Sequence, residues 1–362
     1  MYKTCIQCGA MHYRPDNEYP YVQNTGNLLI GYGVNSIAPT NKYFNMWTNL
    51  GEDTVSYIRN NYDCILLGAA NFINPAWNFD IVTANLKKLN MPIVVFGLGA
   101  QAPDSNVENL VLTESNINFA NTLSYYCKSI GVRGAYTAEI LNSIGVKNTT
   151  IIGCPSYYLC NNANFRIEKK VVDNILDLNV AVNYTNLTKP FEQSILKLAH
   201  KYNTDIIGQM EYVEDIWSKN IDPKSCHKDL YTSSIFKESL FKKVLNTDID
   251  SIKSFLKDHF YQFYNPAKWI THMKSYDFVF GSRIHGAISA VQAGVPALLV
   301  VHDSRTKELA DFLNIPYITP KDITDPLYLS HLYDRTDYSQ FNAKYHEKFI
   351  NFQQFLKINN LL

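Results

Sequence analysis

The run GSRIHGAISAVQAGVPALLV, residues 281–300, places an arginine and a histidine two positions apart between two apolar segments. Residues 276–286, YDFVFGSRIHG, begin as a buried strand, and residues 287–294, AISAVQAG, are typical of a helix. Residues 295–303, VPALLVVHD, predict the next strand. A strand–helix–strand unit of this length is typical of a parallel sheet that helices cover on both faces.

The same alternation recurs along the chain, and it divides into two sets near residues 160–178. Strands are expected within 63–70, 92–101, 123–134, 147–156, 178–186 and 204–210, and helices at 137–145, 190–202, 249–260, 305–314 and 341–362. The sequence therefore predicts an α/β fold of two doubly wound parallel-sheet domains, with the ligand in the interdomain cleft. We expect an N-terminal domain at 1–170, a C-terminal domain at 171–335, and a helix at 336–362 that could pack back on the first domain.

Composition limits the classes of partner. The chain has 362 residues, 46% of them hydrophobic, which is enough for two ordinary cores. Lysine plus arginine equals aspartate plus glutamate at 33 each, so the basic surplus of a nucleic-acid-binding protein is missing and no nucleic acid is expected. The start of the chain lacks an apolar signal-peptide segment, and no run of ~18 apolar residues predicts a membrane span. Seven cysteines without a signal peptide fit the cytoplasm, the expected location.

Cys5 and Cys8 form a single C-x-x-C, with His12 nearby. A structural zinc site needs about four ligands, and no second cysteine pair follows at short range. We expect ordinary thiols at these positions, and we expect neither a metal nor a cofactor.

The Arg283–His285 pair follows a predicted strand, where ligands of α/β sheets gather. In extended backbone these two side chains would share one face and reach the same ligand. The free N–H groups of the next helix, beside Ser282, favour an anion, and Gly286 would let that ligand approach closely. The alternative is a structural Arg–His pair whose groups bind backbone carbonyls on a loop.

The segment FGSRIHGAISAVQAGVPALLV resembles the C-terminal signature of the polysaccharide pyruvyltransferase family. PIVVFGLGAQ, GVRGAYTAEILNSIGV, IIGCPS and the NTGN run at 24–27 resemble further motifs of that family, in the expected order. Two positions depart from the pattern: Asn27 and Cys154 stand where aspartate is common. The resemblance implies a GT-B-like pair of Rossmann-type domains. It also implies an enzyme that moves the pyruvyl unit of phosphoenolpyruvate onto a sugar of a bacterial surface polysaccharide or its precursor, forming a pyruvate ketal and releasing phosphate.

The resemblance places Arg283 and His285 in the donor site and Arg133 at the arginine position of the N-terminal domain. The chemistry of the proposed reaction and the positions of the residues in the sequence suggest the other roles. Arg283 and His285 would be catalytic, with His285 as general acid. The expected donor-binding residues are Arg133, Ser282, Arg283, His285, Gly286 and Lys268, and the expected acceptor-binding residues are Asn24, Gly26 and Asn27. The base stays open among Asp63, Asp104, Glu139, Glu211 and Asp303. Aromatic residues at 43–47 and 261–269 are candidates to stack on sugar rings, although most such side chains belong to cores. Arg305 opens a predicted helix, and we expect its side chain to be solvated there.

Two other functions share this fold. One is a GT-B glycosyltransferase with a nucleotide-sugar donor, and the other is a non-catalytic carbohydrate-binding protein. For the transferase reading, the expected partners are phosphoenolpyruvate as co-substrate and a sugar or lipid-linked oligosaccharide as acceptor. A lipid-linked acceptor would place the enzyme at the inner face of the plasma membrane, with peripheral association. The acceptor hydroxyls, a ketal or enolpyruvyl ether product, and the oligomeric state stay open.

Overall fold

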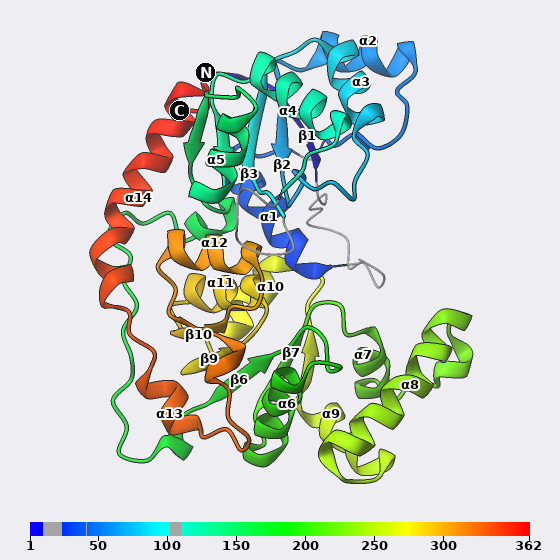
Figure 1. Cartoon of the computed structure of the whole chain (residues 1–362), viewed down its shortest axis with the longest axis vertical. Helices are drawn as coiled ribbons and strands as arrows, with labels where there is room; N and C mark the ends of the chain where they lie inside the picture. Colours follow the sequence, from blue (N-terminus) through cyan, green and yellow to red (C-terminus); the bar gives the residue numbers. More distant parts are fainter. Residues whose placement is uncertain (10–23, 41, 102–109) are drawn as a thin grey trace.

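The computed structural model describes residues 1–9, 24–40, 42–101 and 110–362. Figure 1 shows two α/β domains, one above the other. Within the described residues, each domain holds one parallel sheet, of five strands and of six. The first sheet ends at Ile151 and the second begins at Val180. The prediction of two Rossmann-type parallel-sheet domains in a GT-B-like arrangement is confirmed.

The N-terminal sheet places its strands in chain order. These are β1 (Cys5–Gly9), β2 (Cys64–Gly68), β3 (Ile93–Leu98), β4 (Ile130–Val132) and β5 (Thr149–Ile151). At the free edge of β1, Gln7 forms an isolated parallel bridge with Tyr43. After β1, the chain therefore first runs along one side of this strand, at Tyr43, and then along its other side, at β2. This reversal is a topological switch point, where α/β sheets bind ligands.

Side chains of the central strands alternate between two cores, as a sheet buried on both faces requires. Ile65 and Leu67 face a core with the helices α2 (Glu52–Asn61), α3 (Asp80–Leu89), α4 (Glu114–Tyr126) and α5 (Ala135–Ser143). Cys64 and Leu66 face the opposite core, with α1 (Thr25–Ile37) and α14 (Ser339–Ile358). Helix α1 and a helix from the other end of the chain therefore help to cover that second face.

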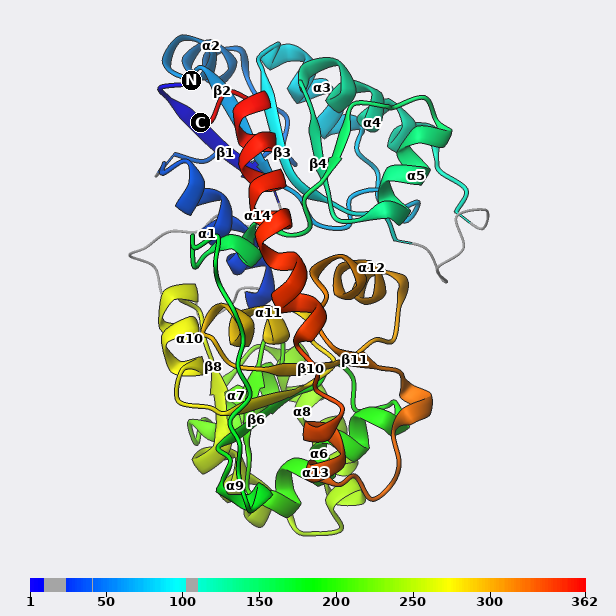
Figure 2. The ribbon, with the colours of Figure 1, turned by 90° about the vertical axis from the view of Figure 1, so that its left-hand side faces the viewer.

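The C-terminal helix α14 packs on the N-terminal sheet. Figure 2 shows it rising from the C-terminal domain across that sheet, so the two chain ends lie close together. The Phe355 ring meets Phe96 of β3 at 5.7 Å between centroids. The Asn351 amide donates to the Ile151 carbonyl at 2.9 Å, and Tyr2 N donates to the Asn360 carbonyl at 2.9 Å. Helix α14 thus joins the two domains on one side.

The C-terminal sheet has the strand order β11-β10-β9-β6-β7-β8. Its strands are β6 (Val180–Asn183), β7 (Asp205–Gly208), β8 (Phe260–Gln262), β9 (Phe278–Gly281), β10 (Ala297–Val300) and β11 (Tyr317–Ile318), all parallel. Counted from β6 as the first strand, this is the order 3-2-1-4-5-6 of the dinucleotide-binding Rossmann fold. The strand order reverses between β6 and β9, which is therefore the switch point of this sheet. The residues that follow these two strands are therefore expected to meet a ligand.

Helices cover both faces of this sheet. The face toward the N-terminal domain carries α10 (Pro266–Met273), α11 (Ile284–Gln292) and α12 (Ser304–Leu313). The far face carries α6 (Pro190–Tyr202), α7 (Tyr212–Ser218), α8 (Lys228–Leu245), α9 (Ile249–His259) and α13 (Leu329–Asp334). Both sheets are thus covered on both faces.

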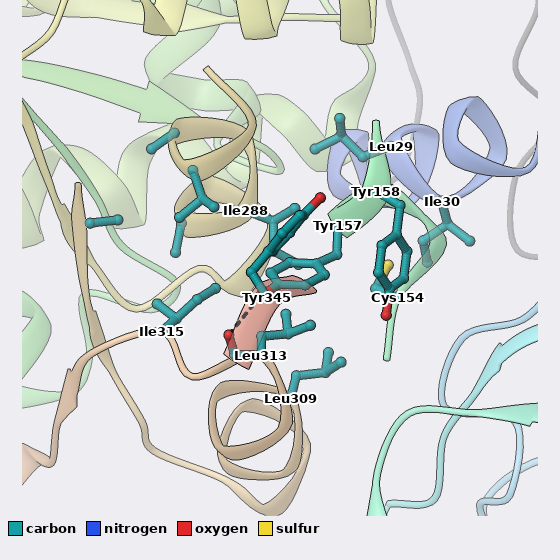
Figure 3. Close-up of a cluster of buried hydrophobic side chains, with 14 of the residues drawn as sticks. Leu29, Ile30, Cys154, Tyr157, Tyr158, Ile288, Leu309, Leu313, Ile315 and Tyr345 are labelled. Carbon is teal, nitrogen blue, oxygen red and sulfur yellow. Dashed lines mark hydrogen bonds between the residues drawn. The ribbon is translucent and has the colours of Figure 1, made fainter. Parts of the chain in front are cut away.

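One hydrophobic core runs through both domains. Figure 3 shows Tyr157 and Tyr158 between Leu29 and Ile30 of α1 on one side and Ile288 of α11 and Leu313 of α12 on the other. The Tyr157 hydroxyl donates to the Leu313 carbonyl at 2.9 Å. A shared apolar core of this kind holds the two domains in one relative position, because separating them would expose buried side chains to water.

The structure changes three details of the predicted elements. Residues 123–126 end helix α4, so the strand expected within 123–134 is confined to Ile130–Val132. Helix α11 begins at Ile284, three residues before the predicted start. The family pattern also leads us to expect a strand ahead of the NTGN run, which MHYRPDNEYPYVQ, residues 11–23, hardly indicates; a strand is present at Cys5–Gly9, and residues 11–23 lie outside the described residues.

Candidate functional site

The site lies where the two switch points face each other. A cavity of about 270 Å³, called the central cavity here, opens between the domains. It is lined by Asn24, Asn27, Ala70, Asn71 and Arg133 from the N-terminal domain and by Thr185, Gln209, Met210, Ser282, Arg283, Ile284, His285, His302, Arg305, Thr306 and Leu309 from the C-terminal domain. The predicted interdomain cleft is therefore present.

Most of the residues predicted for the site meet at this cavity. Of these, Asn24, Asn27, Arg133, Ser282, Arg283 and His285 line it. Gly26 and Gly286 lie beside it: a β-carbon on Gly26 would meet Gln209 and His285, and one on Gly286 would meet the Asn183 amide. Lys268 is exposed on α10 and does not line the cavity. The structure therefore brings together every predicted donor and acceptor residue except Lys268.

The junction between β9 and α11 forms one wall. Ser282 donates its hydroxyl to the buried Glu192 carboxylate at 2.9 Å and lies 2.6 Å from the Thr185 hydroxyl. Arg283 is the N-cap of α11 and supplies no side-chain hydrogen bond to the first turn. An arginine has only donors, so it cannot accept from those N–H groups. The positive end of α11 thus faces the cavity through Ile284 and His285.

The expectation that Arg283 and His285 share a face of extended backbone is wrong. Because α11 begins at Ile284, Arg283 caps the helix and His285 lies in its first turn. The Arg283 guanidinium forms a buried ion pair with Glu211, and its Nε donates to the Tyr184 carbonyl at 2.9 Å. His285 points instead toward Cys154 of the N-terminal domain, with 3.7 Å between Nε2 and Sγ. The two side chains diverge from the junction.

Arg283 therefore has a structural task within the site. Glu211, its ion-pair partner, also accepts from the backbone N–H groups of Gln209 and Met210, at 2.7 and 2.9 Å. The pair fixes the loop after β7, which presents Gln209 to the cavity. Gln209 is 2% exposed, and its amide nitrogen has no hydrogen-bond partner among the described residues. An unpaired buried donor at a cavity indicates a ligand that accepts from it.

His285 is 7% exposed, and its surroundings favour the neutral ring. Burial and the nearby Arg133 charge lower the pKa of His285 to about 3. Cys154, which stands where aspartate is common, adds no opposing charge, because burial raises the pKa of its thiol. Without a bound ligand His285 is therefore an uncharged imidazole at neutral pH.

Two further arginines reach the cavity. Arg133 is 4% exposed; its Nε donates to the Gly97 carbonyl at 2.9 Å and its Nη1 to Asn71 Oδ1. No carboxylate among the described residues forms an ion pair with it. Arg305 Nε donates to Asp303 at 2.9 Å, and its guanidinium lines the cavity. The buried Arg133 charge interacts with the nearby carboxylates of Glu308 and Asp303 but forms no ion pair within the described residues, so it can bind an anionic ligand directly.

None of the described carboxylates considered as the base lines the central cavity. Among the described residues that line the central cavity there is no aspartate or glutamate. Glu211 and Asp303 are held by arginines, Asp63 accepts from the N–H groups of Lys3 and Thr4, and Glu139 is exposed on α5. Asp104 lies outside the described residues. The titratable bases that do line the cavity are His285 and His302.

Sequence reasoning missed Arg305, Gln209 and Asn71. Arg305 follows the strand VPALLVVHD, and its position at the carboxyl end of β10 was a usable signal. Asn71 and Gln209 follow β2 and β7 in the same way, but a single amide after a strand is common in loops.

Neither a metal group nor a membrane helix appears in the described parts of the chain. No cluster of three or more histidine, cysteine, aspartate or glutamate side chains is arranged there to hold a metal ion. None of the helices described combines the length and apolarity that crossing a bilayer requires. Cys5 lies 3.2 Å from Cys64 on β2, sulfur to sulfur, whereas Cys8 is buried in the core on the other face of the sheet. The C-x-x-C pair therefore does not converge.

The sequence model of the polysaccharide pyruvyl transferase family matches residues 10–304. The chain belongs to this family. Membership supports a transferase that acts in polysaccharide biosynthesis, as the resemblance implied. Three of the segments that resemble motifs of the family contribute residues to the central cavity: Asn24 and Asn27, Arg133, and the run from Ser282 to His285.

Solved structures with similar folds share little of their sequence with this chain. HepE from Anabaena in complex with UDP-glucose is 12% identical, with 99% of this chain and 98% of that chain covered and a TM-score of 0.47. UDP-N-acetylglucosamine 2-epimerase from Rickettsia bellii is 12% identical, with 99% and 96% covered and a TM-score of 0.49. Similarity at this level does not indicate a substrate for this chain. A comparison with curated protein sequences finds no match.

Proposed function

We propose that the protein binds phosphoenolpyruvate in the central cavity and transfers its pyruvyl unit to a sugar, with release of inorganic phosphate. The observation that carries the proposal is the buried Arg133, whose partners are neutral oxygens and whose charge faces the positive end of α11 across the cavity. An anionic group placed between Arg133 and the start of α11 would interact favourably with both.

The size and polarity of the cavity support this donor. Its volume of about 270 Å³ lies just below the roughly 300–1,000 Å³ of typical ligand pockets, so by itself it suits phosphoenolpyruvate better than a nucleotide sugar, which would also need adjoining space. Phosphoenolpyruvate carries a phosphate and a carboxylate. Arg133 and the N–H groups of α11 would hold one of them, and Arg305 would hold the other by exchanging its contact with Asp303. The Gln209 amide would donate to the same ligand.

The chemistry follows from these positions. Ketal formation needs a proton on the vinyl carbon, attack of two sugar hydroxyl oxygens on the carbon that becomes cationic, and departure of phosphate. The two hydroxyl protons balance the reaction: one ends on the new methyl group and the other on the phosphate. His285 would carry a proton between these atoms. It is neutral in the empty site, and the negative charge of the donor would raise its pKa toward the range where it can both accept and donate.

The acceptor is a sugar of a polysaccharide or of its precursor, in keeping with the family. A free sugar nucleotide, a soluble oligosaccharide and a lipid-linked oligosaccharide all offer the hydroxyl pair. A lipid-linked acceptor would bring the reaction to the inner face of the plasma membrane.

The test measures ligand-dependent thermal stability of the purified protein. A ligand that binds only the folded state raises the melting temperature by mass action. We expect a rise with phosphoenolpyruvate and none with UDP-, GDP- or CMP-sugars. Arg133→Gln, which keeps a donor but removes the charge, should abolish that rise. Arg335→Gln, an exposed arginine paired with Asp322, is the matched control and should keep it.

A second measurement follows phosphate release when candidate sugars are added with phosphoenolpyruvate. Release that depends on both substrates and fails in His285→Gln supports a transferase. A rise in melting temperature with a nucleotide sugar alone would replace the proposal with a GT-B glycosyltransferase. Binding of sugars without any response to either donor would indicate the non-catalytic alternative.

A further inference from the structure

A second cavity adjoins the central one and is lined by aromatic rings. This aromatic cavity has a volume of about 400 Å³. It shares Asn24, Asn27, Ala70, Asn71 and Arg305 with the central cavity and adds Trp47, Phe72, Trp77 and Gln101. Because the two cavities have five residues in common, ligands in the two cavities would be neighbours.

Two indoles form one wall of the aromatic cavity. The ring centroids of Trp47 and Trp77 lie 5.5 Å apart, and the Trp77 ring stacks on Phe79 with 19° between the planes. Trp77 is 48% exposed, whereas the other two described tryptophans outside the cavity, Trp217 and Trp269, are 3% and 1% exposed. An indole held rigidly by a buried aromatic cluster, with one face open to a cavity, is a platform for an apolar ligand face.

The remaining lining groups are mainly neutral amides. Asn71 Oδ1 accepts from Arg133, so the amide nitrogen is the group of Asn71 that can donate to a ligand. Gln101 Oε1 accepts from the Asn74 amide at 3.3 Å, which likewise directs its nitrogen outward. Arg305, the cation among these residues, is paired with Asp303. Side-chain amides around an aromatic platform suit hydroxyl groups rather than an ion.

We propose that the aromatic cavity is the acceptor subsite, in which a neutral pyranose stacks on Trp77 and Trp47 and directs two hydroxyl groups toward the central cavity. The C–H face of a pyranose is apolar and its rim carries hydroxyl groups, which matches the indoles and the amides in turn. This assignment rests on the proposed function of the central cavity. Asn71 connects the two subsites, because the same side chain binds Arg133 and faces the sugar.

The test uses methyl glycosides of galactose, glucose, mannose and N-acetylglucosamine, titrated into the full chain in the presence of phosphoenolpyruvate. Trp217 and Trp269 are buried and cannot contact the glycoside, so a change of tryptophan emission that is lost in Trp77→Ala reports on the aromatic cavity. We expect at least one glycoside to change the emission. Calorimetry should show that it binds Trp77→Ala about tenfold more weakly, the loss expected from removing a stacking contact of about 1.4 kcal/mol. Tyr125→Ala, an exposed aromatic on α4 outside both cavities, is the matched control and should bind like the wild type.

Separate readouts distinguish the two proposals. The rise in melting temperature with phosphoenolpyruvate reports on the central cavity and should persist in Trp77→Ala. Equal glycoside affinity in Trp77→Ala and the wild type would overturn the acceptor subsite, and so would a wild-type protein that binds none of the four glycosides. If the wild type shows no response to phosphoenolpyruvate while Trp77→Ala still loses glycoside binding, the proposed donor fails and the sugar subsite stands.

Discussion

The His285 ring of the C-terminal domain lies directly against Gly26 in the first turn of α1. A β-carbon on Gly26 would lie 2.9 Å from His285 Nδ1 and 2.4 Å from the Gln209 side-chain oxygen. Real β-carbons do not approach other atoms so closely. Position 26 in the NTGN run therefore has to be glycine, because two side chains of the other domain occupy the space that a β-carbon would need.

Gly26→Ala should reduce turnover by roughly tenfold or more while the protein stays folded. The atoms that the new methyl group meets are side-chain ends, so His285 and Gln209 would shift rather than the backbone, and misplacement of a catalytic group by about 1 Å costs up to about a hundredfold in rate. Phosphate release and the melting temperature measure the two effects. Gly51→Ala, where the added carbon meets open space, is the control. Wild-type turnover in Gly26→Ala would show that the contact does not position His285.

The stability of the protein should fall with acid through His285. The pKa of this residue is about 3 in the folded protein and 6.5 as the ordinary value. Below pH 6.5 the unfolded chain therefore binds a proton that the folded protein does not, and the free energy of unfolding decreases as pH falls, by up to about 1.4 kcal/mol per pH unit. His285→Gln removes this proton, so its stability should fall less between pH 6.5 and pH 4. Denaturant unfolding at a series of pH values measures the difference.

The matched control for this acid dependence is His331→Gln, at an exposed position. The comparison is between slopes of stability against pH and not between absolute stabilities, because glutamine changes the packing at a buried site. Identical slopes in the wild type and His285→Gln would contradict the burial of a neutral imidazole.

Cys154→Asp should raise the pKa of His285. The sulfur lies 3.7 Å from His285 Nε2, and a carboxylate there would favour the charged ring, opposing the effects of burial and of Arg133. NMR titration of the histidine ring protons measures the shift. Cys154→Ser, which adds a polar group without charge, is the control. An unchanged His285 titration in Cys154→Asp would mean that the two side chains do not interact.

Glu211→Gln should destabilise the fold by about 3 kcal/mol or more, because it leaves the Arg283 charge buried without its partner. The double variant Glu211→Gln with Arg283→Met should lose less than the sum of the single losses, since the two groups interact directly. Chemical denaturation measures all three proteins. Glu238→Gln breaks the exposed pair with Lys242 and should change stability little. Additive losses in the double variant would exclude the coupling.

Helices and strands with a strong apolar periodicity could be predicted from the sequence. Elements whose structure depends on pairing with a distant segment could not. Residues 190–202 carry an apolar stripe bounded by Pro190, and α6 spans those residues. By contrast, β1 is the five-residue run CIQCG. The polar Gln7 in its centre interrupts the apolar pattern of a buried strand, so the strand becomes evident only from its pairing with β2 and from the bridge to Tyr43. The site shows the same division, since Arg133 and His285 stood in recognisable motifs, whereas Trp77 stood in an ordinary loop.

The sequence by itself determined the α/β class, the two alternating sets of strands and helices, and the motifs at Arg133 and at Arg283–His285, because these depend on residues that are close in the chain. Only the tertiary structure decided that Arg283 pairs with Glu211, that His285 meets Gly26 and Cys154, and that Trp47 and Trp77 open beside Asn71. Those contacts join residues far apart in the chain. They form only after two sheets, α1 and α14 share one core, and no local pattern of amino acids carries that information.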